Sequence, residues 1–282
     1  MRRSFVNLYL FILIFTPLPG MGDKPKVVIL CGGMGTRLRD YADPVPKALV
    51  RIGEMPIIWH VMKTYAHYGY TDFVLCLGFK GDSIRRYFLD FEHMTNDFTL
   101  NLRSREQRVI SHGQVEDWRI TFAETGLHSK TARRIKLIEK YIDTEHFFCT
   151  YTDGLSTVDI PQLYDFHTRT GKVATLTAVN PASPFGVVTE EGGLVTSFRE
   201  KPQLAGLTNG GFFCFSRKVF SYLEGDVFLE QEPLTRLANE GQLAAFRHEG
   251  FWMPMDTFKD VERLNKMYDE QNVPWMVWRN AP

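Results

Sequence analysis

The sequence predicts an α/β fold built on one mostly parallel sheet. From Lys26 onward, short runs rich in β-branched or aromatic residues alternate with segments of helical periodicity, the pattern of layered α/β proteins. No repeat, low-complexity tract or flexible linker interrupts this alternation, so both halves of the chain should share one continuous sheet. The 282 residues, 44% of them hydrophobic, suffice for a sizeable core. Ligands of such open sheets bind beyond the carboxyl ends of the strands.

The first half of the chain alternates strands and helices and then changes character. We expect strands at 27–30, 72–77 and 147–151, and helices from Ile57 to about Gly69, around 84–91 and at 130–142. Residues 95–125 differ, because the stretches TLNL, RVI and WRITFAE alternate like strands with no helix between them. These residues are therefore predicted to form a small antiparallel, strand-rich arm.

The second half continues the same mixture of elements. Strands are expected at VATLTAV, FGVV, LVTSF, FFCF and AAFRH, and helices near 160–169, 217–224, 231–240 and 257–271.

The charge balance and the cysteines indicate which partners and which cellular compartment to expect. The 33 basic residues balance the 33 acidic ones, so no overall positive field argues for binding nucleic acid or an anionic membrane surface. Each cysteine lies in an apolar, strand-like run, and the spacing matches no zinc or C-x-x-C pattern. We expect reduced, buried thiols and a cytoplasmic protein; the residues concerned are Cys31, Cys76, Cys149 and Cys214.

Residues 1–22 stand apart from this pattern. Two arginines precede an apolar stretch from Phe5 to Phe15, which resembles a signal peptide and is short for a membrane span. No A-x-A-like cleavage site follows, and Met21 lies at a suitable start just before the first strand. Two interpretations stay open: a dispensable extension or mis-called start, and a targeting or anchoring segment.

The stretch LCGGMGTRL, residues 30–38, follows the first strand. Its glycines permit close backbone approach, so successive amides can surround phosphate oxygens while Arg37 supplies a cation. The spacing differs from both the dinucleotide fingerprint and the Walker loop. A phosphate-binding loop and a simple glycine-rich turn are therefore both possible on this stretch alone.

A lysine held in a stiff segment follows the loop. Lys47 lies in VPKAL, where Pro44 and Pro46 restrict the backbone. Together, the G-G-x-G-T-R-L loop and the proline-flanked lysine resemble the signature of sugar-phosphate nucleotidyltransferases. Longer stretches are similar to the glucose-1-phosphate cytidylyltransferases among them: IGEMPIIWH, GFKGDSIRRYF, TYTDGLSTVDI, FREKP, NGGFF, EQEPLTRLANEGQLAAFRHEGFWMPMDT and the terminal PW.

The resemblance implies a three-layer, Rossmann-like nucleotidyltransferase fold and a Mg²⁺-dependent reaction. A cytidylyl group would pass from CTP to α-D-glucose 1-phosphate, giving CDP-glucose and pyrophosphate. Residues 23–282 would form a single domain, with a nucleotide-binding half at 23–145 that carries the arm at 95–125, and a sugar-phosphate-binding half at 146–282. It also implies a homo-oligomer, in which the strand-rich arm at 95–125 is the expected contact between chains.

The resemblance also assigns roles residue by residue. Catalytic groups would be Arg37 and Lys47. The nucleotide would be bound by Leu30, Cys31, Gly32, Gly33, Met34, Gly35, Thr36, Ser129, Arg134 and Thr152. The sugar phosphate would be bound by Glu200, Lys201 and Asn209, and Mg²⁺ by Asp153 and Asp256. Such chemistry needs cations and metal ligands because two anionic substrates must meet; since the attacking phosphate oxygen is already ionised, no general base is assigned.

Several of these assignments have a plainer alternative. Asp153 could merely end a strand, and Asp256 could cap the helix at 257–271, alone or in addition to holding a metal. Glu200 and Lys201 could be a solvated surface pair, and Arg133 with Arg134 an exposed helix face.

Four departures from the family pattern, at Thr152, at Ala132–Arg133, at Met55 and at Pro184, leave the base and sugar specificity open. The alternatives are therefore a nucleotidyltransferase for another nucleoside triphosphate or sugar 1-phosphate, and a catalytically silent binding protein.

Overall fold

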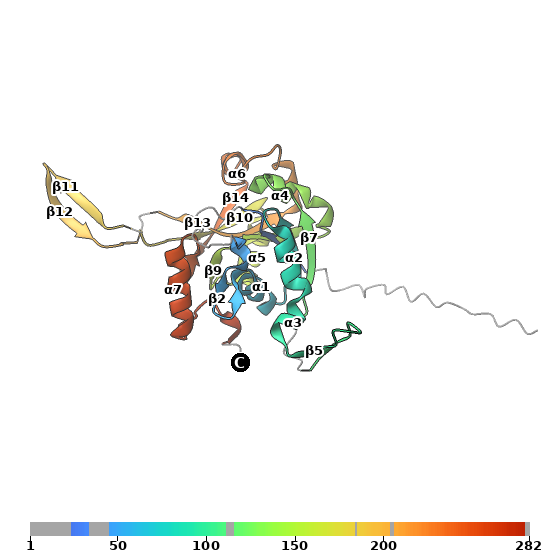
Figure 1. The fold of residues 1–282 in the computed structure, drawn as a ribbon. Coiled ribbons are helices and arrows are strands. Elements are labelled where there is room, and N and C mark those ends of the chain that lie inside the picture. Colours follow the sequence, from blue (N-terminus) through green and yellow to red (C-terminus); the bar gives the residue numbers. More distant parts are fainter. Residues whose placement is uncertain (1–23, 34–44, 111–115, 184, 204–205, 280–282) are drawn as a thin grey trace, which may run out of the picture.

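The computed structural model describes residues 24–33, 45–110, 116–183, 185–203 and 206–279 (Figure 1). A seven-stranded sheet runs through it in the order β14-β10-β13-β8-β1-β4-β7. Its strands are β1 (Val27–Leu30), β4 (Asp72–Leu77), β7 (Arg119–Glu124), β8 (His146–Tyr151), β10 (Ala174–Val179), β13 (Thr208–Ser216) and β14 (Leu243–His248). β13 is antiparallel to β10 and β8, and the other neighbours are parallel. The prediction of a mostly parallel sheet shared by both halves is confirmed.

Helices cover both faces of this sheet. Because side chains alternate along a strand, Val27 and Ile29 enter one core while Val28 and Leu30 enter the other. The first core is closed by α1 (Ile57–His67), α2 (Gly81–Leu89), α5 (Ile160–Thr170) and α7 (Phe258–Asp269), and the second by α4 (Thr131–Leu137), η4 (Arg217–Ser221) and α6 (Glu232–Asn239). This arrangement is the three-layer architecture that the family resemblance implies.

The predicted helix at 130–142 is divided. It consists of α4 and the 3-10 helix η3 (Glu139–Tyr141), and the helix expected near 217–224 is the 3-10 helix η4. Several short elements lie outside the main sheet: η2 (Lys47–Leu49), β2 (Arg51–Ile52), β3 (Met55–Pro56), α3 (Phe91–Thr95), β9 (Gly154–Ser156), β15 (Trp252–Pro254) and η5 (Val277–Arg279).

The predicted arm is smaller than residues 95–125. β5 (Phe98–Leu100) and β6 (Gln107–Val109) form an antiparallel hairpin, as expected. The third predicted strand of the arm is wrong, because β7 joins the main sheet parallel to β4, with Asp72 opposite Arg119. An edge strand is only half covered and shows the same polar–apolar alternation as an antiparallel strand, so the sequence pattern does not distinguish the two.

A second hairpin projects from the body of the molecule (Figure 1). It consists of β11 (Val187–Glu191) and β12 (Leu194–Arg199), which pair antiparallel, and every residue of both strands is exposed. Among the described residues, no helix is long and apolar enough to cross a membrane. All the cysteines are buried and unpaired, as predicted.

The sheet brings distant segments of the chain together at one edge. Leu30 lies opposite Cys76 on one side and Tyr151 on the other, so the segments that follow β1, β4 and β8 emerge side by side. Beyond that edge β9 pairs antiparallel with β15, with Gly154 opposite Pro254. This pairing places residue 153 next to residues 255 and 256.

Candidate active site

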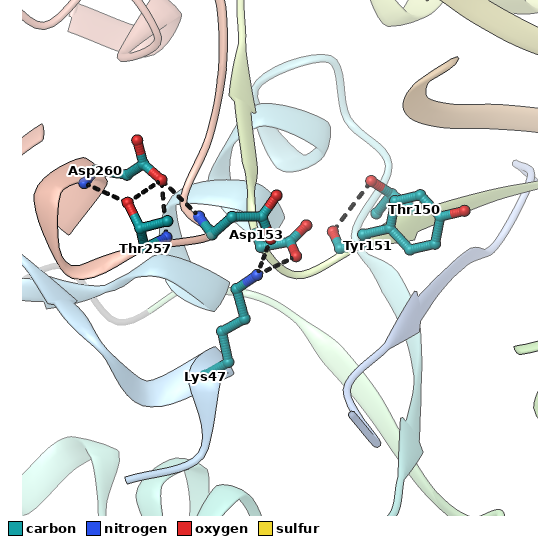
Figure 2. Close-up of polar contacts among 7 residues, drawn as sticks. Lys47, Thr150, Tyr151, Asp153, Thr257 and Asp260 are labelled. Carbon is teal, nitrogen blue, oxygen red and sulfur yellow. Dashed lines mark hydrogen bonds and ion pairs between the residues drawn. The ribbon is translucent and has the colours of Figure 1, made fainter. Parts of the chain in front are cut away.

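A lysine and two carboxylates meet at this edge of the sheet. The Lys47 ammonium donates to Asp153 Oδ2 at 2.6 Å and to Asp256 Oδ1 at 2.7 Å. Figure 2 shows the Lys47 side chain extending toward Asp153. The three side chains are 17%, 27% and 42% exposed, respectively, so the cluster is partly shielded and still reachable from solvent. We call these residues the Lys47 cluster.

The backbone fixes each member of the cluster. Lys47 begins η2 directly after Pro46, and Asp153 lies between β8 and β9. The Met255 amide donates to the Asp153 carbonyl oxygen at 2.7 Å, which ties the two aspartate-bearing loops together. Asp153 and Asp256 are more than a hundred positions apart in the chain, and the β9–β15 pairing brings them together; Lys47 reaches both of them from η2.

The structure corrects the expectation that Asp256 caps the last helix. Thr257 is the N-cap of α7, and with Asp260 it forms a capping box in which the Thr257 hydroxyl and backbone exchange hydrogen bonds with residue 260 (Figure 2). Thr257 has the short hydroxyl side chain that suits this position. The carboxylate of Asp256 is directed instead to Lys47.

The cluster holds its lysine in the charged form. Burial lowers the pKa of Lys47, but the charges and hydrogen bonds of Asp153 and Asp256 outweigh it, so the pKa lies above its usual value. Lys47 is therefore a cation at neutral pH. The cluster therefore combines one positive charge with two carboxylates, whose oxygens are of the kind that hard metal ions prefer.

Arg134 occupies a buried position under the start of the glycine loop. It is 4% exposed, which excludes the expectation of an exposed helix face at this residue, whereas Arg133 is exposed. Its guanidinium donates to the carbonyl oxygens of Gly32, Leu77, Gly126 and Leu127 and to the Thr125 hydroxyl, at 2.7 to 3.3 Å. Arg134 thus joins the last residue of β4 to the segments that follow β1 and β7, while burial lowers its pKa.

The predicted glycine loop is described only at its beginning. Leu30, Cys31 and Gly32 are buried and Gly33 is exposed, at the carboxyl end of β1. Met34, Gly35, Thr36 and Arg37 lie outside the described residues.

Gly32→Ala is expected to destabilise the protein. A Cβ at this position would overlap the Arg134 guanidinium, which its hydrogen bonds hold in place. We expect the free energy of unfolding to fall by about 1–3 kcal/mol, measured by urea denaturation. Gly33→Ala is the matched control, because nothing lies within 4 Å of a Cβ there. Equal stability losses in the two variants would contradict the packing of Arg134 on Gly32.

A cavity of about 350 Å³ opens beside the Lys47 cluster. Asp153, Asp256 and Asn209 all line it, so the structure brings three predicted residues to one space. Asn209 Oδ1 accepts from the Gly211 amide at 3.0 Å, and the Trp252 indole donates to the Gly210 carbonyl oxygen at 2.8 Å. A larger cavity of about 770 Å³, between α1, α2 and α3, has none of the predicted site residues in its described lining.

Other predicted residues lie apart from the cavity. Glu200 and Lys201 follow β12 at the base of the projecting hairpin, 3.8 Å apart and each 63% exposed, as in the surface-pair alternative. Thr152 is buried, and the described lining of the cavity does not include it. Ser129 is half-buried and its hydroxyl lies close to Gly126, in the loop that Arg134 holds.

Comparison with known proteins identifies the family. The model of the nucleotidyl transferase family matches residues 26–271, which include the Lys47 cluster and Arg134. The chain belongs to the nucleotidyl transferase family. As a nucleotidyl transferase it is an enzyme, and members of this family generally use a divalent metal ion.

This nucleotidyl transferase is similar in sequence to two named relatives and in fold to one solved structure. A protein of Bacillus subtilis (strain 168) named "Probable glucose-1-phosphate cytidylyltransferase" is 45% identical over 255 residues, covering 90% of this chain and 100% of its own. The glucose-1-phosphate cytidylyltransferase of Salmonella typhi is 42% identical over 256 residues, with 90% and 99% coverage. The crystal structure of HddC from Yersinia pseudotuberculosis shares the fold, with a TM-score of 0.65, 20% identity and coverage of 86% and 99%.

Two residues beside the site of the nucleotidyl transferase had no role in the sequence analysis. Tyr151, which lines the cavity, donates from its hydroxyl to Glu230. Both lie in stretches that carry the family resemblance, Tyr151 in TYTDG and Glu230 in EQEPL. Both stretches are among those that carry the resemblance, but only tertiary contact shows that they meet.

Proposed function

We propose that this nucleotidyl transferase transfers a cytidylyl group from CTP to α-D-glucose 1-phosphate, releasing CDP-glucose and pyrophosphate. The observation that carries the proposal is the Lys47 cluster, which lies beside the strand end that opens the glycine loop and next to a cavity lined by Asn209. The relatives named glucose-1-phosphate cytidylyltransferase support the choice of base and sugar, since they match over 90% of this chain.

The reaction needs no covalent intermediate with the protein. A phosphate oxygen of the sugar 1-phosphate attacks the α-phosphorus of CTP, a new P–O bond forms, and the bond from that phosphorus to the pyrophosphate oxygen breaks in line with it. Lys47 and Arg37 offset the negative charge of the two substrates, and the glycine loop from Leu30 to Thr36 holds the triphosphate. Ser129, Arg134 and Thr152 define the nucleotide side, and Glu200, Lys201 and Asn209 the sugar-phosphate side.

Asp153 and Asp256 suit Mg²⁺. Carboxylate oxygens are the ligands that this ion prefers, and it usually takes one or two carboxylates together with substrate phosphates. Both residues direct an oxygen to the same ammonium, so one cation can reach both of them. When bound there, Mg²⁺ supplies charge neutralisation on the phosphates.

We further propose that the enzyme is a cytoplasmic homo-oligomer of single-domain chains, with the halves 23–145 and 146–282 contributing the nucleotide and sugar-phosphate sides. The exposed β11–β12 hairpin supports an assembly, because isolated two-stranded hairpins are marginally stable in water and Val188, Leu194, Val195 and Phe198 are all more than half exposed. A partner chain covering this hairpin would also surround Glu200 and Lys201. Sedimentation of the pure enzyme at assay concentration tests this, and a monomer would contradict it.

One assay tests the proposed reaction. Pyrophosphate release is measured with Mg²⁺ over a panel of nucleoside triphosphates and sugar 1-phosphates, and CTP with glucose 1-phosphate is expected to give the highest kcat/KM. A preference for UTP or dTTP, or for another sugar, would replace the proposal with the alternative that Thr152, Ala132 and Arg133 leave open. No release with any pair, while ligands still bind, would indicate a silent binding protein.

A further inference from the structure

Glu230 connects two parts of the active site that are distant in sequence. Its carboxylate accepts a hydrogen bond from the Tyr151 hydroxyl through Oε1 and another, at 3.1 Å, from the Thr131 hydroxyl through Oε2. Both oxygens are thus engaged, each with a different element of the fold. We call Glu230, Tyr151 and Thr131 the Glu230 clamp.

The Tyr151 side of the clamp leads to the metal ligand. Tyr151 is the last residue of β8 and lies two positions before Asp153. Its ring packs edge-on against Phe213 at 5.8 Å between centroids, and it also lies so close to Gly211 that a Cβ there would overlap it. Since the ring is fixed on β13, the hydroxyl has a defined position and Glu230 is its acceptor.

The Thr131 side of the clamp leads to the nucleotide side. Thr131 is the first residue of α4, the helix that carries Arg134 and through it holds Gly32. The Leu229 amide donates to the Thr131 hydroxyl at 2.7 Å, and the Ala132 amide donates to the Val227 carbonyl oxygen at 3.2 Å. The segment before Glu230 is therefore attached to the start of α4 at several points.

We propose that Glu230 is a positioning residue for nucleotidyl transfer: it fixes α4, on the nucleotide side, relative to the strand end that bears Asp153. This inference rests on the proposed function and deepens it, giving a role to the EQEPL stretch. Glu230 touches neither substrate in this role and acts through Tyr151 and Thr131. Displacements of about 1 Å between reacting groups cost about 10²-fold in rate. Loss of a positioning residue is therefore expected to lower turnover more than it lowers the stability of the fold.

The test measures kcat, the two KM values and the melting temperature of the full-length enzyme, with the substrate pair that works best in the panel. In Glu230→Ala, kcat/KM for the nucleotide is expected to fall by about 10- to 100-fold, through a lower kcat and a higher KM for the nucleotide. The KM for the sugar 1-phosphate should change by less than about threefold, because the Gly211 amide holds Asn209, and Asn209 contacts the clamp only through the Tyr151 hydroxyl, which Glu230→Ala leaves in place. Glu230→Gln should recover part of the loss, since an amide oxygen still accepts one hydrogen bond.

A double-mutant cycle shows whether Glu230 acts through Tyr151. Tyr151→Phe keeps the ring and removes only the hydroxyl, and its loss should lie below that of Glu230→Ala. The double variant should lose no more than Glu230→Ala alone, because both changes break the same contact. Multiplied losses in the double variant would overturn the proposal.

The matched control is a second tyrosine–glutamate pair, neither member of which is in the described lining of the site cavity. The Tyr222 hydroxyl donates to Glu240 Oε2 at 2.7 Å, between η4 and the end of α6. Tyr222→Phe and Glu240→Ala are expected to leave kcat and both KM values unchanged. Three outcomes would overturn the proposal that Glu230 is a positioning residue. They are an equal kinetic loss in the control pair, unchanged kinetics in Glu230→Ala, and a loss of activity that a lower melting temperature explains. If a nucleotide other than CTP were the best substrate, the proposed cytidylyl transfer would be wrong, but the positioning role of Glu230 would stand. If no substrate pair gave turnover, both the proposed function and the role of Glu230 would be wrong.

Discussion

Lys47→Met is expected to lower kcat by about 10²–10³-fold. Methionine has nearly the same length and apolar stem as lysine, so the change removes the charge and leaves most of the packing. The ammonium lies between Asp153 at 2.6 Å and Asp256 at 2.7 Å, and without it the site loses one of the positive charges that offset the negative charges of the two anionic substrates. Steady-state pyrophosphate release, with each substrate varied in turn, measures the effect.

A second lysine offers the control for this prediction. Lys26 is 18% exposed, against 17% for Lys47, and pairs with Asp143 at 2.9 Å at the amino end of β1, the edge of the sheet opposite the site. Lys26→Met should leave kcat within about twofold of wild type, because a surface ion pair of this kind contributes at most about 1 kcal/mol to stability and nothing to the site. Similar kcat values for the Lys47 and Lys26 variants would show that Lys47 is only a structural ion-pair partner.

Asp153→Asn is expected to lower kcat by about 10³-fold and to raise the Mg²⁺ concentration needed for half-maximal rate by about 10- to 100-fold. Asparagine has the same shape and retains the backbone carbonyl oxygen that accepts from Met255. What it removes is one of the two carboxylates that reach the Lys47 ammonium, and with it a hard anionic ligand for the metal. Initial rates over a Mg²⁺ series at saturating substrates give both quantities.

Asp143→Asn is the matched variant, since Asp143 also pairs with a lysine at 2.9 Å but lies far from the carboxyl ends of the strands. It should show the wild-type rate and the wild-type Mg²⁺ dependence. If Asp153→Asn reduced kcat with an unchanged Mg²⁺ requirement, its carboxylate would serve to orient Lys47 and the assignment as a metal ligand would be wrong.

Much of the fold follows from local sequence. The apolar face of α1, at Ile57, Ile58, Val61, Met62 and Tyr65, is buried as its 3.6-residue periodicity predicts. The prediction of an arm holds for β5 and β6, where two short strands pair with each other. It was wrong for β7, which pairs with β4 in the main sheet. Which strand a segment pairs with depends on the tertiary arrangement of the sheet and cannot be read from the segment's own residues.

For the site, too, the sequence predicted some features and only the structure shows others. Lys47, Asp153 and Asp256 were expected to share a site because the resemblance names them, and their contact in the structure agrees with that hypothesis. The sequence did not separate the roles of Asp256 and Thr257 at the start of α7. A cap depends on which side chain reaches the first free amides, and that is set by the exact backbone path at residues 256 and 257.

The sequence by itself determined the alternation of strands and helices, the glycine-rich stretch after the first strand and the residue types that a phosphate-transfer site needs, because these depend on periodicity and chemistry within short segments. Only the tertiary structure decided that Arg134 is buried against Gly32, that Lys47 lies between Asp153 and Asp256, and that Glu230 joins Tyr151 to Thr131. Each of these contacts joins residues from different elements, so its existence depends on how the sheet orders its strands and not on any single stretch of the chain.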